Sequence, residues 1–142
     1  MKLTLHARGR HAAAGALFKS SGVARKNAGA IIEFTLGLGF DIKEKGSDGA
    51  NALLVAAGSG NVPGIEHLLQ NHGGIFSVRD IDNRGRGAAH YAAEEGRVEA
   101  LRFLVRAGAD PELADQAGES PVHLAAQNDH HEVLELFAEL LS

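Results

Sequence analysis

The amino-acid sequence predicts an all-α solenoid of about four stacked helix pairs joined by hairpin-like turns. Three observations support this prediction. Two stretches that begin at Asp82 and Asp115 repeat the same residues 33 positions apart. An earlier stretch repeats them again at an offset of 36. In the second half of each copy, apolar residues follow a helical spacing, which indicates an amphipathic helix.

The last two copies show the clearest self-similarity. They share an aspartate, a glycine, a histidine, two adjacent alanines and a glutamate, always 33 positions apart. The matched pairs are Asp82 with Asp115, Gly85 with Gly118, His90 with His123, Ala92-Ala93 with Ala125-Ala126, and Glu99 with Glu132. Because all of these positions keep one spacing, we interpret the copies as successive structural units.

Earlier copies extend the array toward the N-terminus. About three residues are inserted between the second and third copies, and they fall in Gly73–Ile81, which we expect to be a loop. A degenerate copy precedes them, in which Gly39 and Gly49 have the spacing of Gly108 and Gly118. We therefore expect a single domain over residues 1–142. Its parts are a degenerate N-terminal repeat with a lead-in (1–45), two repeats (46–81 and 82–114) and a C-terminal repeat (115–142).

Each unit has a pattern with a physical explanation. The alanine pairs lie on a short first helix, where a small, helix-favouring side chain lets neighbouring helices approach closely. Gly60 and Gly96 follow, and glycine suits a left-handed turn because it lacks a Cβ. Asn27 and Asp129 take this position in the outer copies, and both tolerate that conformation better than most residues. The second helix then carries apolar residues at helical spacing, as in Val98, Leu101, Leu104 and Val105.

The residues of the last unit match a known pattern, D-x-x-G-x-T-P-L-H-x-A-A-x-x-G. They are Asp115, Gly118, Ser120, Pro121, Val122, His123, Leu124, Ala125 and Ala126. With two further copies in register, the sequence resembles the ankyrin repeat family over about residues 20–142. Two departures stand out. Gly87-Ala88-Ala89 replaces Thr-Pro-Leu in the third unit, and Asn51-Ala52-Leu53-Leu54 lacks the histidine in the second.

This resemblance implies a function as well as a fold. The family's usual role is protein binding through a concave surface made by the hairpin tips and the first helices. It also implies that His90 and His123 are structural, each making a hydrogen bond that ties its turn to a neighbour. Side chains at the exposed positions differ between the copies, as a recognition surface requires. The candidate partner-binding residues are Asn83, Arg84, Arg86, Tyr91, Glu94, Glu95, Gln116, Glu119, Gln127 and Asn128.

Other chemistries are weakly supported. Ser120, His123 and Asp115 include the residue types of a hydrolase triad, but Ser120 before Pro121 is better explained as a helix N-cap, so we expect no enzyme. The adjacent pair His130-His131 is poorly placed for a shared metal ion, because consecutive helical residues point about 100° apart. Glycine-rich stretches lack the lysine of a phosphate-binding loop. We therefore expect no catalytic residue, metal or cofactor.

Composition suggests where the protein works and what could bind it. The chain has no cysteine, which fits a reducing compartment, so we expect the cytoplasm, with the nucleus as the alternative. No run approaches the ~18 apolar residues of a membrane span. Residues 2–26 carry basic groups and no acid, so a targeting signal is an alternative to a folded lead-in.

Charge is distributed unevenly along the chain. Residues 1–47 carry 8 basic and 3 acidic groups, whereas residues 110–142 carry 8 acidic groups and none that is basic. Two alternatives to a protein-binding role follow. The basic end could contact nucleic acid, which the lack of interleaved aromatics there makes unlikely, or oppositely charged ends could self-associate weakly. Neither alternative names the expected protein partner.

Overall fold

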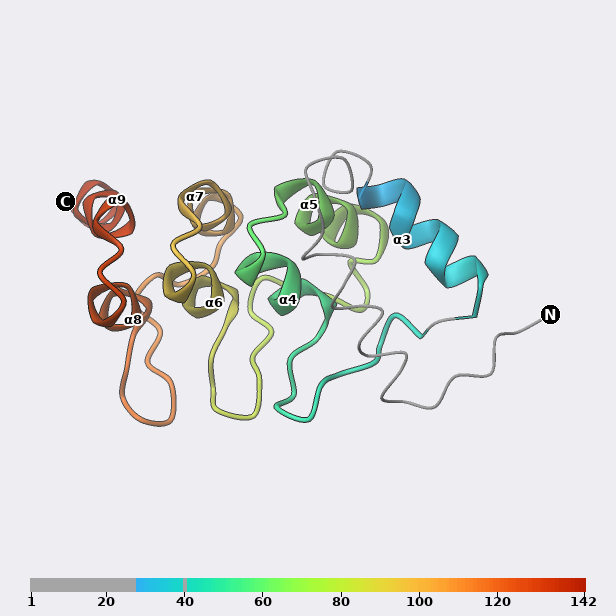
Figure 1. Ribbon diagram of the computed structural model, residues 1–142, viewed down its shortest axis with the longest axis horizontal. Coiled ribbons are helices and arrows are strands. Elements are labelled where there is room, and N and C mark those ends of the chain that lie inside the picture. The colour runs from blue at the N-terminus through green and yellow to red at the C-terminus, as the bar shows by residue number, and fades with distance from the viewer. Residues whose placement is uncertain (1–27, 40) are drawn as a thin grey trace.

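The computed structural model describes residues 28–39 and 41–142. Within these residues the chain forms seven helices and no named strand, which confirms the all-α solenoid. The helices are α3 (Ala28–Gly37), α4 (Ala52–Gly58), α5 (Val62–Asn71), α6 (Ala88–Glu94), α7 (Val98–Arg106), α8 (Pro121–Gln127) and α9 (His131–Leu140). Figure 1 shows α4, α6 and α8 in one row and α5, α7 and α9 in a second, with loops projecting beyond the first row. Asn27 and the basic residues considered as a targeting signal lie outside the described residues.

An N-cap hydrogen bond and left-handed turn residues mark the boundaries of these helices. The Asn51 Oδ1 atom accepts a hydrogen bond of 3.0 Å from the Leu54 amide at the start of α4, and this N-cap satisfies a backbone donor that lacks a helical partner. The turn between the paired helices is left-handed at Gly60 and Gly96, with φ of 69° and 73°. Asp129 has φ of 57° at the equivalent position, which confirms the register predicted from the repeat.

The core lies between the two rows of helices. Alanines of the first helices are buried, including Ala56, Ala57, Ala92 and Ala93, and they let α4, α6 and α8 pack side by side. Ala125 is buried as well, but Ala126 is exposed because no described helix packs on the outer side of α8. The second helices fill the remaining space with fully buried leucine and isoleucine side chains, among them Ile65, Leu68, Leu101 and Leu104.

Long side chains join the last two inter-helix turns to the preceding unit. The Arg97 Nε atom donates to the Gly58 carbonyl oxygen at 3.0 Å. One repeat later, the His130 Nε2 atom donates to the Glu94 carbonyl oxygen at 2.8 Å. Gly96 leaves the space that this ring needs, since a Cβ there would lie 2.8 Å from His130 Nδ1. His130 therefore closes the joint between the third and fourth units.

The insertion between the second and third units forms a loop, as predicted. This segment leads from α5 to α6 and is anchored at two points. Phe76 is buried in the core, and the Asp80 carboxylate accepts hydrogen bonds from Asn51 Nδ2 at 3.0 Å and from the Ser77 amide at 2.9 Å. The loop is thus anchored to the second unit through Phe76 and Asp80, while most of its other residues are exposed.

The two ends of the described stack differ. Val133, Leu136 and Phe137 of α9 are buried and Leu134 is half-buried, so the large apolar side chains of the last helix expose little surface to solvent. Phe34 of α3 is 69% exposed at the other end. No described helix is both long enough and apolar enough to cross a bilayer. The self-association suggested by the charged ends stays a prediction.

Candidate protein-binding surface

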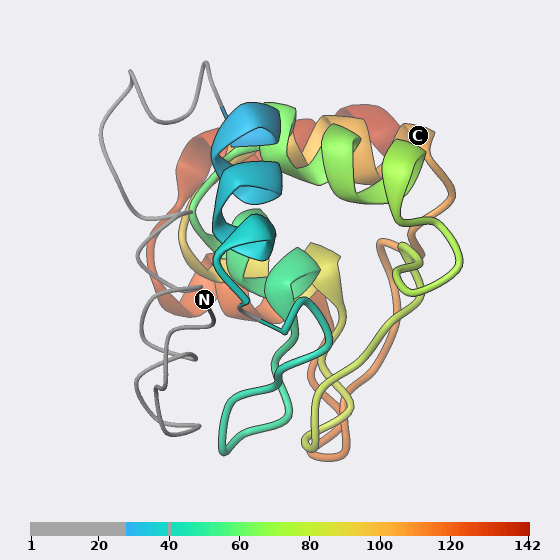
Figure 2. The same cartoon turned by 90° about the vertical axis from the view of Figure 1, so that its right-hand side faces the viewer.

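The hairpin-like loops form a continuous arm beside the helices. Each loop is closed by its own backbone hydrogen bond, such as Asp82 N–H to the Arg86 carbonyl at 2.9 Å. Neighbouring loops are also joined, because Asn83 N–H donates to the Asp48 carbonyl and Gln116 N–H to the Arg84 carbonyl, both at 2.9 Å. Figure 2 shows the loops projecting together on one side of the helices. These backbone bonds between loops give the arm a defined shape.

A buried aspartate organises each of the last two loops. The Asp82 side chain is fully buried, and its Oδ1 atom accepts from the Arg84 amide at 2.8 Å and the Arg86 amide at 3.0 Å. Asp115 makes the same pair of contacts with the amides two and four residues later. Aspartate favours such turns because its short carboxylate reaches the following backbone amides. The repeated Asp-x-x-Gly signal therefore fixes the loop conformation.

Tyr91 and Arg84 converge on the second oxygen of Asp82. The Tyr91 hydroxyl donates to Asp82 Oδ2 at 2.7 Å, and the Arg84 Nη2 atom lies 3.0 Å from the same oxygen. Burial acts to raise the pKa of Asp82, but the hydrogen bonds from Tyr91 and the backbone outweigh it, so the pKa is lowered. Burial and the ionised Asp82 raise the pKa of Tyr91. The phenol therefore stays neutral, with its hydroxyl directed inward.

Paired side chains line the corner between the loops and the first helices. The Arg86 Nη1 atom lies 3.4 Å from Glu94 Oε2, and Arg86 Nε donates to Asp115 Oδ2 at 3.1 Å. At the equivalent positions one repeat later, Gln127 donates to the Glu119 carboxylate. The second unit has only Ala50 and Gly58 at these positions. The corner therefore changes chemistry from one unit to the next.

The predicted partner-binding residues divide into two groups. Arg86 is only 14% exposed, and it joins the third and fourth units instead of extending into solvent. Tyr91, Glu94 and Glu119 are partly buried as well. The side chains that face solvent are those of Asn83, Arg84, Glu95, Gln116, Gln127 and Asn128. These six residues, which we call the exposed set, are the candidates for direct contact with a partner.

The two predicted structural histidines have different surroundings. His90 is buried, and its Nδ1 atom accepts from the Gly87 amide at 3.2 Å, so Nε2 carries the proton and donates to the Glu119 carbonyl at 2.9 Å. His123 Nδ1 accepts from the Ser120 amide at 3.0 Å, but this residue is exposed. His90 therefore links two units, and His123 closes its own turn.

Ser120 and His123 do not form a hydrolase triad with Asp115. The Ser120 Oγ atom lies 2.9 Å from His123 Nδ1, the nitrogen that also accepts from the Ser120 amide. Asp115 instead contacts Arg86 and the backbone of its own loop. A triad needs a carboxylate to orient the base, and this aspartate is directed elsewhere.

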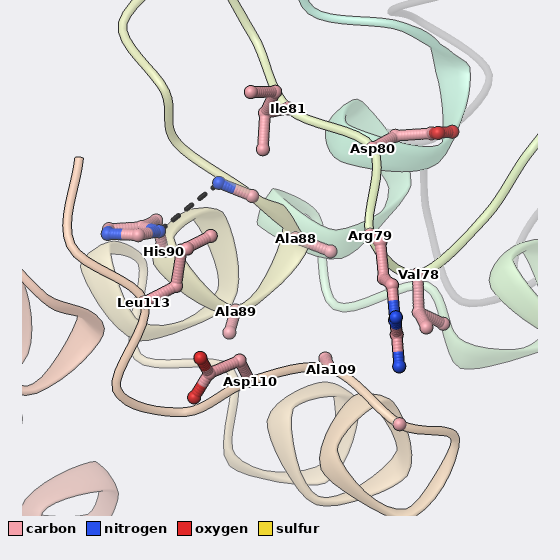
Figure 3. A pocket seen from close by; sticks show the side chains of 12 residues that line it. Val78, Arg79, Asp80, Ile81, Ala88, Ala89, His90, Ala109, Asp110 and Leu113 are labelled. Carbon is pink, nitrogen blue, oxygen red and sulfur yellow. Dashed lines mark hydrogen bonds between the residues drawn. The ribbon is translucent and has the colours of Figure 1, made fainter. Parts of the chain in front are cut away.

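A hollow of about 520 Å³ lies between two connecting segments, the one from α5 to α6 and the one from α7 to α8. Figure 3 shows residues 78–81 on one side and the segment from Ala109 to Leu113 on another, with His90 at the edge. Its walls are mainly apolar, with Arg79 and Asp110 at the rim. Sequence reasoning did not find this hollow, because it forms between loops of successive units.

Acidification tests the protonation state assigned to His90. Burial lowers the pKa of His90 by disfavouring the charged ring, although its hydrogen bond to the Glu119 carbonyl acts in the opposite direction. The unfolded chain therefore binds this proton first, near its ordinary pKa of about 6.5. The stability contributed by neutral His90 is present above that pH and is lost below it. Urea unfolding from about pH 7.5 to about pH 5.5 should show a falling free energy of unfolding.

The matched variant is His90→Gln, which does not titrate. Its free energy of unfolding should fall less over the same interval, because the variant lacks the titratable ring at position 90, the only group by which the two proteins differ. The difference in slope is at most about 1.4 kcal/mol per pH unit. Equal slopes in the two proteins would show that His90 does not resist protonation.

Taken together, the stacked helix pairs and the linked loops define a helical repeat protein. Residues 21–115 match the family described as ankyrin repeats in three copies, and residues 117–141 match a single ankyrin repeat. The chain belongs to the ankyrin repeat family. Ankyrin repeats generally mediate protein–protein interaction, and proteins of this family are generally non-catalytic adaptors.

Curated proteins that are similar to this chain include the following relatives. Human ankyrin repeat domain-containing protein 63 is 39% identical over 95 residues, which cover 64% of this chain and 24% of the relative. The Notch-regulated ankyrin repeat-containing proteins of human and Xenopus tropicalis are 34% identical over 80 residues, which cover 56% of this chain and 70% of each relative. The chain thus spans about a quarter of the first relative's length.

Proposed function

We propose that this chain is a non-catalytic module that binds a protein partner through its concave surface. That surface consists of the loop arm, the pairs Arg86–Glu94 and Glu119–Gln127 at the corner between loops and helices, and the ends of the first helices. The main support is that hydrogen bonds join the loops across units while the exposed set differs from copy to copy. A rigid platform with variable side chains suits protein recognition, because binding then costs little ordering entropy. We further propose that it acts as an adaptor in the cytoplasm, with the nucleus as the alternative.

The charge of the last unit suggests what the partner carries. Residues 110–142 hold 8 acidic groups and no basic one. Most of these acids are exposed: Glu112 lies between α7 and α8, and Glu132, Glu135 and Glu139 lie on α9, in the row of second helices. Complementary charge accelerates association and favours one orientation. Because three of these four acids lie on a second helix, outside the concave surface, they would act by long-range attraction on a partner rich in lysine or arginine, and its association should weaken with added salt.

Site-specific photo-crosslinking tests the proposed surface before the partner is known. Benzoylphenylalanine is placed at Glu95 or Gln127 of the exposed set, and in matched controls at Glu99 or Gln70 on the second helices. All four positions are exposed, so folding should be preserved. We expect crosslinked adducts from the concave positions and few from the controls. Adducts that form only from Glu99 and Gln70 would place recognition on the other face and refute the proposal.

A further inference from the structure

Outside the concave surface, two histidines and a glutamate meet on one oxygen atom. Glu33 lies on α3, His67 lies on α5 and His72 ends that helix. The Glu33 Oε2 atom is 3.2 Å from His67 Nε2 and 3.0 Å from His72 Nε2. One ligand atom from each residue lies within 4.8 Å of the others. The cluster therefore joins the first described helix to the second unit through three side chains.

These distances match the edges of a metal coordination polyhedron. A tetrahedral zinc site with ligand bonds of roughly 2.0–2.1 Å has neighbouring ligand atoms about 3.3 Å apart. Both separations between Glu33 and the histidines are within a few tenths of an ångström of that value. The imidazole rings are tilted by 56° with centroids 5.8 Å apart, so they are not stacked on each other. The two histidine ligand atoms lie within 4.8 Å of each other, a separation that the ligands of one ion can close by adjustment of the side chains.

The surroundings hold one ring in position and leave the cluster open to solvent. Gly29 of α3 lies against His67, since a Cβ at that glycine would be 2.7 Å from Nδ1 of the ring. The histidine side chains are 19% and 18% exposed and that of Glu33 is 52% exposed. An ion can thus reach the cluster from solution. The exposed carboxylate also leaves room for water as a further ligand.

A neighbouring amide can support the metal-bound form. The Asn71 Nδ2 atom lies 3.2 Å from His67 Nδ1. When Nε2 binds a metal, Nδ1 carries the proton and needs an acceptor, as metal-bound histidines usually have. Rotation of the Asn71 amide would place its oxygen there. Asn71 is therefore a positioning residue for His67.

We propose that Glu33, His67 and His72 bind one divalent transition-metal ion, for which Zn²⁺ is the best-fitting candidate. Two imidazole nitrogens and one carboxylate oxygen are donors that zinc accepts, whereas magnesium and calcium prefer all-oxygen sites. Three protein ligands leave a position for water. The bound ion would fasten α3 to α5 and so couple metal supply to the stability of the N-terminal end of the stack.

Calorimetric titration of the full chain with ZnCl₂ tests this site. We expect one saturable ion per chain and no comparable binding of MgCl₂. His67→Ala, His72→Ala and Glu33→Gln should each weaken zinc binding at least about tenfold, and Asn71→Ala should weaken it less. His131→Ala, an exposed histidine on α9, is the matched control and should bind zinc as the wild type does.

Thermal unfolding provides a second readout that does not depend on calorimetric heats. Zinc should raise the Tm of the wild type and of His131→Ala, but not that of His72→Ala. Circular dichroism without metal checks that each variant is folded. No saturable binding, or binding that the His72→Ala and Glu33→Gln variants retain in full, would overturn the proposal.

Discussion

Replacing His90 with alanine is expected to lower the free energy of unfolding by about 2–4 kcal/mol. The ring is fully buried, so its loss leaves a cavity between the third and fourth units. The Gly87 amide, which donates to His90 Nδ1, also loses its acceptor in a buried position. The Glu119 carbonyl is less affected, because it accepts a second hydrogen bond from the Asp115 amide. Equilibrium urea unfolding measures the change.

His123→Ala is the matched control for this prediction. His123 occupies the same position one repeat later and accepts a similar bond from its own turn, but it is exposed. Its replacement should cost less than about 1 kcal/mol, because water can satisfy the groups that it leaves. Similar losses in the two variants would mean that the interface between units does not depend on His90.

Hydrogen exchange locates the effect of His90→Ala along the chain. A repeat array is stabilised mainly by contacts between neighbouring units, so a damaged joint weakens what lies beyond it. Amides of α8 and α9 should therefore exchange faster than in the wild type, while those of α4 and α5 change little. Uniformly faster exchange would instead indicate that the whole array unfolds as one unit.

The fold could be predicted from the sequence because each copy of the repeat contains the residues that form its own turns and its buried helix faces. Asp129 illustrates this point, since the register alone placed it at the left-handed turn where it is found. The turn-forming aspartate of the last two loops and the alanines of the first helices were likewise predicted from their repeated positions. Positions that differ between otherwise equal copies are explained by their neighbours, as when Ala93 is buried and Ala126 is exposed.

The candidate surface was less predictable, because it depends on contacts across units. Arg86 looked like a recognition residue on the tip of a loop, yet it reaches Asp115 of the next loop. The cluster of Glu33, His67 and His72 was not found from the sequence at all. His67 and His72 are separated by four residues, a spacing that zinc ligands can have, but Glu33 lies 34 residues before His67 and nothing in the sequence pairs it with them. Only the packing of α3 on α5 brings them together.

The positions of three residues of the exposed set show how one partner could contact them together. Arg84 is 50% exposed although it contacts buried Asp82, so it can bind a second group without losing its support. Glu95 ends α6 next to Glu94, and Gln127, which pairs with Glu119, ends α8. The three side chains come from the third and fourth units and offer both charge and hydrogen bonds to one partner.

Affinity for the captured partner tests the central proposal most directly. We compare Arg84→Ala, Glu95→Ala and Gln127→Ala in one triple variant with Arg106→Ala, Glu99→Ala and Gln70→Ala in another. Each triple variant removes one arginine, one glutamate and one glutamine from exposed positions, the first from the concave surface and the second from the second helices. The concave variant should bind at least about tenfold more weakly, a loss of about 1.4 kcal/mol, and the control should bind nearly as the wild type does. Full affinity in the concave variant, with weak binding in the control, would contradict recognition through the concave surface.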